Sequence, residues 1–354
     1  MAQSASGDIV WSAIQETPAT VEALRSLCHS RDQLKEQGYT LEPLSADQIE
    51  AKTRCVNCRG EIVSLWKGDL LTVEQDESNI ITTNLHWLRN LLRRSHRRTG
   101  ARKETKLTFT CCGKHVSQPG CVHSRDHTLP PSNEPFNRQY WQHYPTPRLD
   151  QAMTPRSRNR RGQLVMQPYS IHRLNPFTAI ALDCEMGVSF FGESELIRVT
   201  AVDFFSGNIL VDNLVQPEVP MLHYNTRYSG VTRGDIQEAI RRGTCIFGKD
   251  RAREMLWRYV GPDTIVIVHG GRGDLSELRW LHGHIVDSFI LESMTGAEVK
   301  GGKSLKNLCK VKLGIDVQRK GRLGHDSLED AMACRELVID WIEKIGHNWC
   351  APAE

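Results

Sequence analysis

The C-terminal half of the sequence predicts an α/β fold in which helices cover a mixed β-sheet. Three short apolar runs after Pro176 have the composition of β-strands, over residues 178–185, 196–204 and 208–215. Gly207, just before the third run, marks a tight turn and favours an antiparallel pairing of the second and third strands. Strands then alternate with helical patterns. A hairpin followed by such an alternation is typical of a mixed sheet flanked by helices.

The alternation is visible in four further segments. Helical patterns over residues 251–260 and 275–281 flank a fourth expected strand at 264–269, and residues 284–288 supply a fifth. We therefore expect five strands in the sheet.

A last helix is expected to begin near Asp326. Asp326 and Glu329 have the spacing of a capping box, which satisfies the first backbone N–H groups of a helix. The apolar side chains expected to face the sheet are Ala331, Cys334, Val338, Trp341 and Ile345.

Composition indicates a water-soluble globular protein. Of 354 residues, 39% are hydrophobic and 25% charged, and no apolar run is long enough to span a membrane. The first eleven residues lack the basic and apolar stretches of a secretory signal, so we expect a reducing compartment and no membrane partner. In that setting the eleven cysteines are not expected to form disulfides.

The length suits more than one domain, and composition suggests five segments. These are an acidic, helical or partly disordered stretch (1–50), a basic region with zinc-binding spacing (51–127), a linker rich in Pro and Arg (128–176), the α/β domain (177–346) and a tail (347–354). Because the α/β domain has its own predicted core, a fragment from about Pro176 is expected to fold alone.

A basic cluster lies between residues 89 and 114, which hold nine basic side chains and one acidic one. Arg93, Arg94, Arg97 and Arg98 are its candidate contacts to nucleic acid, since counterion release drives binding to phosphates. A solvated helix face and a nuclear-import patch are equally open interpretations. We expect a nuclear or cytoplasmic protein, with the nucleus favoured.

Acidic residues stand where the predicted elements end. Asp183 and Glu185 are two apart at the end of the first strand, so their side chains point to the same side. They follow a buried strand at the edge where open α/β sheets bind ligands. Asp274 opens a helix after 269–273, where a helix-capping role is the simpler alternative.

Asp330 lies in the second turn of the last helix, and His325 just before it. Four carboxylates and one histidine at the edges of one sheet suit two-metal hydrolysis of phosphodiesters. Hard divalent ions prefer oxygen ligands, and a neutral imidazole can take a proton from water. A lone structural histidine is the competing interpretation of His325.

Residues 182–186 (LDCEM), 269–274 (HGGRGD) and 325–330 (HDSLED) resemble, in this order, the three exonuclease motifs of the DEDDh family. Residues 224–232 (YNTRYSGVT) are similar to the RNA exonuclease branch of eukaryotes. The resemblance covers roughly residues 176–345. It implies an RNase H-like fold and a 3′-to-5′ exonuclease.

By the same resemblance, Asp183, Glu185, Asp274 and Asp330 are the ligands of two Mg²⁺ or Mn²⁺ ions, and His325 is the general base. All five are therefore the expected catalytic residues.

The second motif departs from the family pattern at two positions. The family usually has Gly and Asn where this chain has Val268 and Gly273, which affects substrate fit more than chemistry. Met186 and Lys303 are added as candidate contacts to nucleic acid, although a solvated turn is an equally good interpretation of Lys303.

Cys55 and Cys58 have the spacing of a zinc knuckle, and Cys112, Cys121 and His127 can supply the remaining ligands. Four of these five residues are expected to bind a structural Zn²⁺, with unliganded thiols as the alternative. Several RNA exonucleases of the same branch carry a similar N-terminal segment.

The expected function is 3′-to-5′ exoribonuclease activity on the single-stranded 3′ end of RNA, releasing nucleoside 5′-monophosphates in RNA processing or turnover. Two alternatives stay open. One is a 3′-to-5′ DNA exonuclease, because no residue is identified that reads a 2′-hydroxyl. The other is a catalytically idle RNA-binding zinc module.

Overall fold

The computed structural model describes part of the chain in full and part as backbone. Side chains are described for residues 9–45, 48–49, 140–148, 176–189, 193–296, 298–318 and 324–345, and backbone alone for 153–158, 164–168 and 346–349. The zinc candidates Cys55, Cys58, Cys112, Cys121 and His127 and the basic residues Arg93, Arg94, Arg97 and Arg98 lie outside these ranges.

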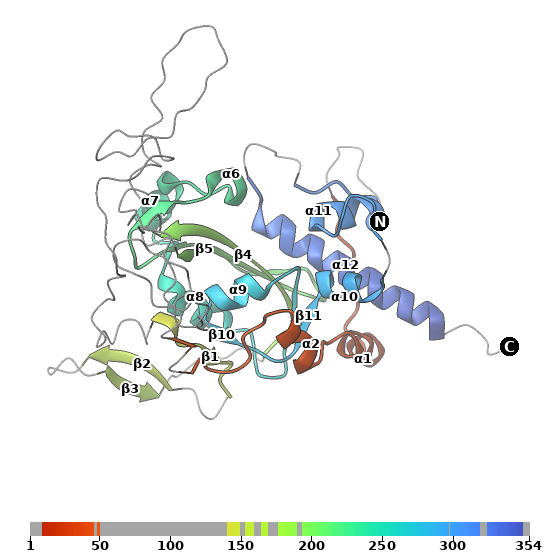
Figure 1. Cartoon of the computed structure of the whole chain (residues 1–354), viewed down its shortest axis with the longest axis horizontal. Helices are drawn as coiled ribbons and strands as arrows, with labels where there is room; N and C mark the ends of the chain where they lie inside the picture. Colours follow the sequence, from red (N-terminus) through yellow and green to blue (C-terminus); the bar gives the residue numbers. More distant parts are fainter. Residues whose placement is uncertain are drawn as a thin grey trace, which may run out of the picture. The chain divides into compact units, whose positions relative to one another are not determined.

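A mixed sheet of seven strands organises the described part of the C-terminal half (Figure 1). In spatial order its strands are β11 (Ile285–Asp287), β9 (Ile265–Val268), β4 (Ala179–Ser189), β5 (Ser194–Asp203), β6 (Ile209–Gln216) and β8 (Ile246–Phe247), and β7 (Met221–His223) pairs with the end of β4. β4, β5 and β6 are antiparallel, whereas β9 and β11 run parallel to β4. The mixed sheet and all five expected strands are confirmed, with shifted ends.

The turn between β5 and β6 has the predicted form. Gly207 has φ +72°, a left-handed conformation that favours glycine. The Asp203 carboxylate accepts a hydrogen bond from the Ser206 amide at 2.9 Å, which closes the turn. The hairpin is antiparallel, as predicted.

Helices cover both faces of the sheet, and alternate residues of β4 face opposite layers. Ala179 and Ala181 pack in a cluster with the long helix α12 (Ser327–Trp349), while Ile180 and Leu182 pack in a second cluster with α8 (Gly248–Leu256). The expected apolar face of the last helix is confirmed, since Ala331, Cys334 and Val338 are buried against the sheet and Trp341 and Ile345 pack beside them.

Shorter elements complete the fold. They are α6 (Thr226–Ser229), α7 (Arg233–Arg242), α9 (Arg272–Glu277), α10 (Ser288–Met294), α11 (Leu305–Leu308) and the π-helical turn at Cys309–Leu313. No described helix has the length and apolar character needed to cross a membrane.

The structure corrects the helix expected over residues 275–281. α9 ends at Glu277, because Arg279 adopts a left-handed backbone conformation with φ +51°. Trp280–Leu281 form the short strand β10 instead, which pairs in parallel with β1 (Tyr144–Pro145). A strand forms here because its pairing partner, β1, lies far away in the sequence.

The region expected to be a linker also contains regular structure. Besides β1, it holds an antiparallel pair formed by β2 (Met153–Arg158) and β3 (Leu164–Pro168). The ladder is irregular just after Pro155, where a proline cannot donate a hydrogen bond.

The N-terminal helices belong to the same compact unit as the sheet. α1 (Pro18–Ser26) and α2 (Arg31–Glu36) each begin with a capping box. Leu24 is buried in the cluster beneath α12, and Leu34 and Tyr39 are buried in the opposite one. This packing argues against the expectation that a fragment beginning near Pro176 folds without them.

Candidate active site

Two carboxylates lie on β4, on the face covered by α12. Asp183 and Glu185 continue the alternation of the β4 residues that pack against α12. The register with β5 places Thr200 directly beside Asp183, and Arg198 beside Glu185. The first motif therefore directs both carboxylates toward the start of the last helix.

The start of α12 brings two more site residues to β4. Ligand atoms of Glu185, His325 and Asp330 all lie within 4.8 Å of one another. His325 Nδ1 is 3.5 Å from Asp330 Oδ2, and the His325 side chain is 43% exposed. Its backbone N–H donates to the Tyr228 carbonyl of α6 at 2.5 Å. The structure thus brings the first and third motifs together.

Asp274 stands in the first turn of α9 and is not its N-cap. The cap position is Gly271, which forms no side-chain capping bond. A Cβ at Gly271 would lie 2.4 Å from the Val268 Cβ, so only glycine fits beside that valine. The glycine at position 271 therefore leaves room for the Val268 side chain. The helix-capping interpretation of Asp274 is wrong.

Burial, together with neighbouring carboxylates, raises the pKa of each of the four candidate ligands. Burial and then the charge of Asp274 raise the pKa of Asp183 well above its usual range. Burial raises the pKa of Asp274 to about 8. Burial, and then the charge of Asp330, raise the pKa of Glu185 to about 8 as well. Burial also raises the pKa of Asp330 to about 6. A divalent cation would relieve this repulsion, and oxygen donors are the ligands that such ions prefer, so the residues fit a metal site.

Comparison with known proteins points the same way, although no family model matches the chain. An uncharacterised exonuclease of Schizosaccharomyces pombe is 37% identical over 47% of this chain and 25% of its own length. RNA exonuclease 3 of Emericella nidulans is 30% identical over 65% of this chain and 36% of its own length. The human RNA exonuclease 1 homolog is 29% identical over 91% of this chain and 24% of its own length.

The chain is thus similar to proteins that are named exonucleases. It spans 24% to 36% of the length of these three relatives. Among solved structures, the protease and nuclease unit of Neurospora crassa Pan2 matches 50% of this chain and 29% of its own, with 21% identity and a TM-score of 0.41.

A buried carboxylate that the sequence did not reveal, Asp287, contacts the second motif at the candidate site. Asp287 Oδ1 accepts from the Gly270 amide at 2.8 Å and from the Phe289 amide at 2.9 Å, and Oδ2 accepts from the Tyr39 hydroxyl at 2.6 Å. Asp287 thereby ties the second motif to the N-terminal segment, and its charge contributes to the raised pKa of Asp274. Its position at the end of a predicted strand was a usable signal.

Gln318 is a second residue of the candidate site that the sequence did not reveal. Its side-chain nitrogen donates to the two carboxylate oxygens of Asp330 at 3.0 and 3.1 Å. Its backbone has φ +55°, which is unusual for a residue other than glycine. No local pattern marks Gln318, because its role depends on a contact with α12.

The two described candidates for nucleic-acid contact, Met186 and Lys303, lie beside residues of the second motif. A Cβ at Gly273 would be 3.8 Å from the Met186 Cε, an ordinary van der Waals distance. The backbone of Lys303 hydrogen-bonds to His269, the first residue of the second motif. Met186, the last residue of the first motif, and Lys303 therefore both lie next to the second motif.

Proposed function

We propose that this chain is a 3′-to-5′ exoribonuclease that releases nucleoside 5′-monophosphates from the 3′ end of single-stranded RNA. The observation that carries the proposal is the convergence of Glu185, His325 and Asp330 within 4.8 Å. RNA as substrate is supported by the names of two relatives, RNA exonuclease 3 and RNA exonuclease 1 homolog. The mixed sheet flanked by helices is the arrangement expected of an RNase H-like domain.

Asp183, Glu185, Asp274 and Asp330 would hold two Mg²⁺ or Mn²⁺ ions, since all four are carboxylates with raised pKa values. When bound, such ions offset the negative charge that develops on the phosphate during hydrolysis. The four carboxylates would hold the ions on the side of the sheet that α12 covers.

His325 is proposed to accept the proton of the attacking water. Its Nδ1 lies 3.5 Å from Asp330 Oδ2 and 3.5 Å from the Gln318 side-chain nitrogen, so Nδ1 faces the protein and Nε2 is the nitrogen proposed to meet water. Asp330 thus orients the ring, and the exposed part of the ring gives water access to Nε2.

The test is to incubate the purified chain with 5′-labelled RNA and DNA of one sequence, in Mg²⁺ or in EDTA. We expect a ladder that shortens from the 3′ end of RNA and needs Mg²⁺. His325→Ala should lower turnover by about 10²–10⁴-fold while changing RNA affinity little, because general-base catalysis contributes in that range. Affinity is measured by fluorescence anisotropy in EDTA.

His284→Ala, on an exposed histidine at the sheet edge, is the matched control and should keep turnover. Shortening of DNA alone would make the chain a DNA exonuclease. RNA binding without any shortening would favour an idle RNA-binding module, and a folded His325→Ala variant with normal turnover would remove this residue from the mechanism.

We also propose that four of Cys55, Cys58, Cys112, Cys121 and His127 bind a structural Zn²⁺. The similarity to the human relative, over 91% of the chain, extends into this N-terminal half and supports a shared module. Metal analysis by mass spectrometry is expected to find stoichiometric zinc in the intact chain and to lose it on Cys58→Ser. Cys28→Ser is the control, because Cys28 packs against the same hydrophobic cluster as Leu24 and is not a candidate zinc ligand. Intact protein without zinc would contradict the proposal.

A further inference from the structure

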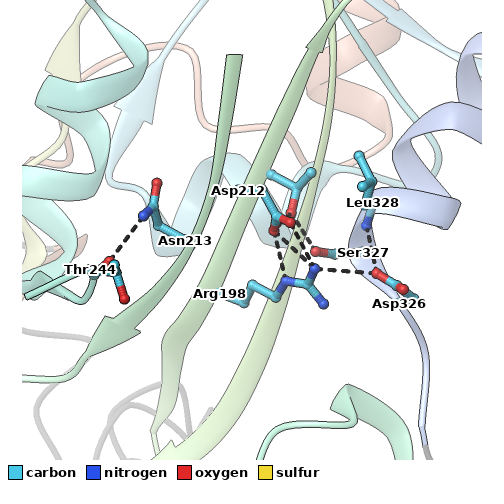
Figure 2. Close-up of polar contacts among 8 residues, drawn as sticks. Arg198, Asp212, Asn213, Thr244, Asp326, Ser327 and Leu328 are labelled. Carbon is cyan, nitrogen blue, oxygen red and sulfur yellow. Dashed lines mark hydrogen bonds and ion pairs between the residues drawn. The ribbon is translucent and has the colours of Figure 1, made fainter. Parts of the chain in front are cut away.

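Arg198 connects the sheet to the helix that carries the third motif (Figure 2). It lies on β5 directly beside Glu185, and its side chain is 19% exposed. Nε donates to Asp212 Oδ1 at 3.0 Å and Nη2 donates to Asp212 Oδ2 at 3.1 Å, so Asp212 on β6 binds the guanidinium through two parallel hydrogen bonds. This leaves Arg198 with one preferred orientation, toward α12.

The same guanidinium reaches the beginning of α12. Arg198 Nη2 is 3.2 Å from Asp326 Oδ1, and this oxygen also accepts from the Leu328 amide at 3.2 Å. Asp326 therefore satisfies an N–H group of the first helical turn and the arginine together. The contact fixes the helix start relative to β5.

A neutral contact lies beside this charged one. The Thr200 hydroxyl is 2.5 Å from the Ser327 hydroxyl and 3.1 Å from Asp212 Oδ1. Asp212 thus anchors both connections between the sheet and the helix start, and Figure 2 shows Arg198 linking Asp212 to Asp326. Thr200 is the cross-strand partner of Asp183, as Arg198 is of Glu185.

The residues joined in this way flank the proposed chemistry. Asp326 follows His325 in sequence, and its carbonyl accepts from the Asp330 amide at 2.9 Å. Glu185 is on the sheet, whereas His325 and Asp330 belong to the helix start. The distance between these two sets depends on how the start of α12 sits against β5.

We propose that Arg198 is a positioning residue that, through Asp212 and Asp326, holds His325 and Asp330 at their distance from Glu185. This inference rests on the proposed exonuclease function for its kinetic part. Arginine suits the role because its planar fork binds one carboxylate with two donors and still reaches another, which a lysine ammonium cannot reproduce.

The test combines hydrogen exchange with kinetics in Arg198→Met, Arg198→Lys and Asp326→Ala. Amides in the first two turns of α12 should exchange faster in all three variants, in the absence of substrate and metal. Turnover should fall by about 10²-fold with KM little changed, since a misplacement of about 1 Å can cost that much. Arg242→Met, which removes an exposed arginine paired with Glu238, is the matched control and should change neither measurement.

The double variant Arg198→Met/Asp326→Ala should be no slower than either single variant, because both remove the same connection. Full turnover in Arg198→Lys would overturn the proposal by showing that charge alone suffices. Unchanged exchange in Arg198→Met, or additive losses in the double variant, would overturn it too. If the wild type hydrolyses no nucleic acid, the proposed function fails, and the exchange measurement alone still decides whether Arg198 holds the helix start.

Discussion

Asp274→Asn is expected to lower turnover by about 10³-fold and, at neutral pH, to raise the melting temperature of the metal-free protein. The loss follows because a ligand that compensates transition-state charge contributes several kcal/mol, and each 1.36 kcal/mol is tenfold in rate, so about 4 kcal/mol gives that factor. The gain follows because burial, and then the charges of Asp287 and Glu277, raise the pKa of Asp274 to about 8. At neutral pH, folding must therefore protonate a carboxylate that is ionised in the unfolded chain, and the neutral Asn side chain removes that cost.

The sign of the pH effect is set by the raised pKa. The folded protein holds the Asp274 proton up to about pH 8, whereas the ordinary value is 3.8. Stability is therefore greatest below the ordinary pKa and decreases as pH rises through the interval between the two values. Glu185, with a pKa of about 8, adds a loss of the same sign. Thermal melts in EDTA from about pH 4 to about pH 9 measure this slope.

The slope should become shallower in Asp274→Asn, and Mg²⁺ should stabilise the wild type more than this variant. Asp235→Asn is a matched control, because Asp235 holds the equivalent first-turn position of α7 but forms an exposed capping box with Thr232. It should lower the melting temperature slightly and leave turnover intact. Near-normal turnover in Asp274→Asn would exclude this residue from the site.

Deletion of residues 1–43 is expected to abolish cooperative unfolding of the rest of the chain. Leu24, Leu27, Leu34 and Tyr39 are buried in the two layers beside the sheet. At about 1.5–3 kcal/mol for each buried side chain, their loss approaches the whole stability of a typical domain, about 5–15 kcal/mol. Circular dichroism and limited proteolysis of the deletion variant, compared with the full chain, measure the effect.

A single substitution separates packing from the deletion itself. Leu34→Ala should destabilise the chain by about 2–5 kcal/mol, the usual cost of such a cavity. Val10→Ala is the control, because Val10 is 55% exposed and should cost little. A deletion variant that melts cooperatively at the temperature of the full chain would show that the N-terminal helices are dispensable, as expected from the sequence pattern after Pro176.

Local patterns were sufficient to predict five of the seven strands of the mixed sheet and the last helix. Alternation along 178–185 placed Asp183 and Glu185 on one side of a strand end, and the helical spacing after Asp326 identified the buried face of α12. These predictions succeed because backbone periodicity dictates side-chain direction over a few residues. The spacing of the three motifs was likewise readable without any tertiary contact.

Contacts between distant segments required the folded chain. The Tyr39 hydroxyl bonds to Asp287, 248 positions further along the chain. Arg198 on β5 pairs with Asp326 at the start of α12. Trp280, expected in a helix, instead pairs with β1. Each of these side chains is locally compatible with an ordinary surface or helix position. The sequence by itself determined which chemical groups face the sheet edge; only tertiary packing decided which buried polar groups hold them there, because a buried donor or acceptor takes whichever partner the fold brings near.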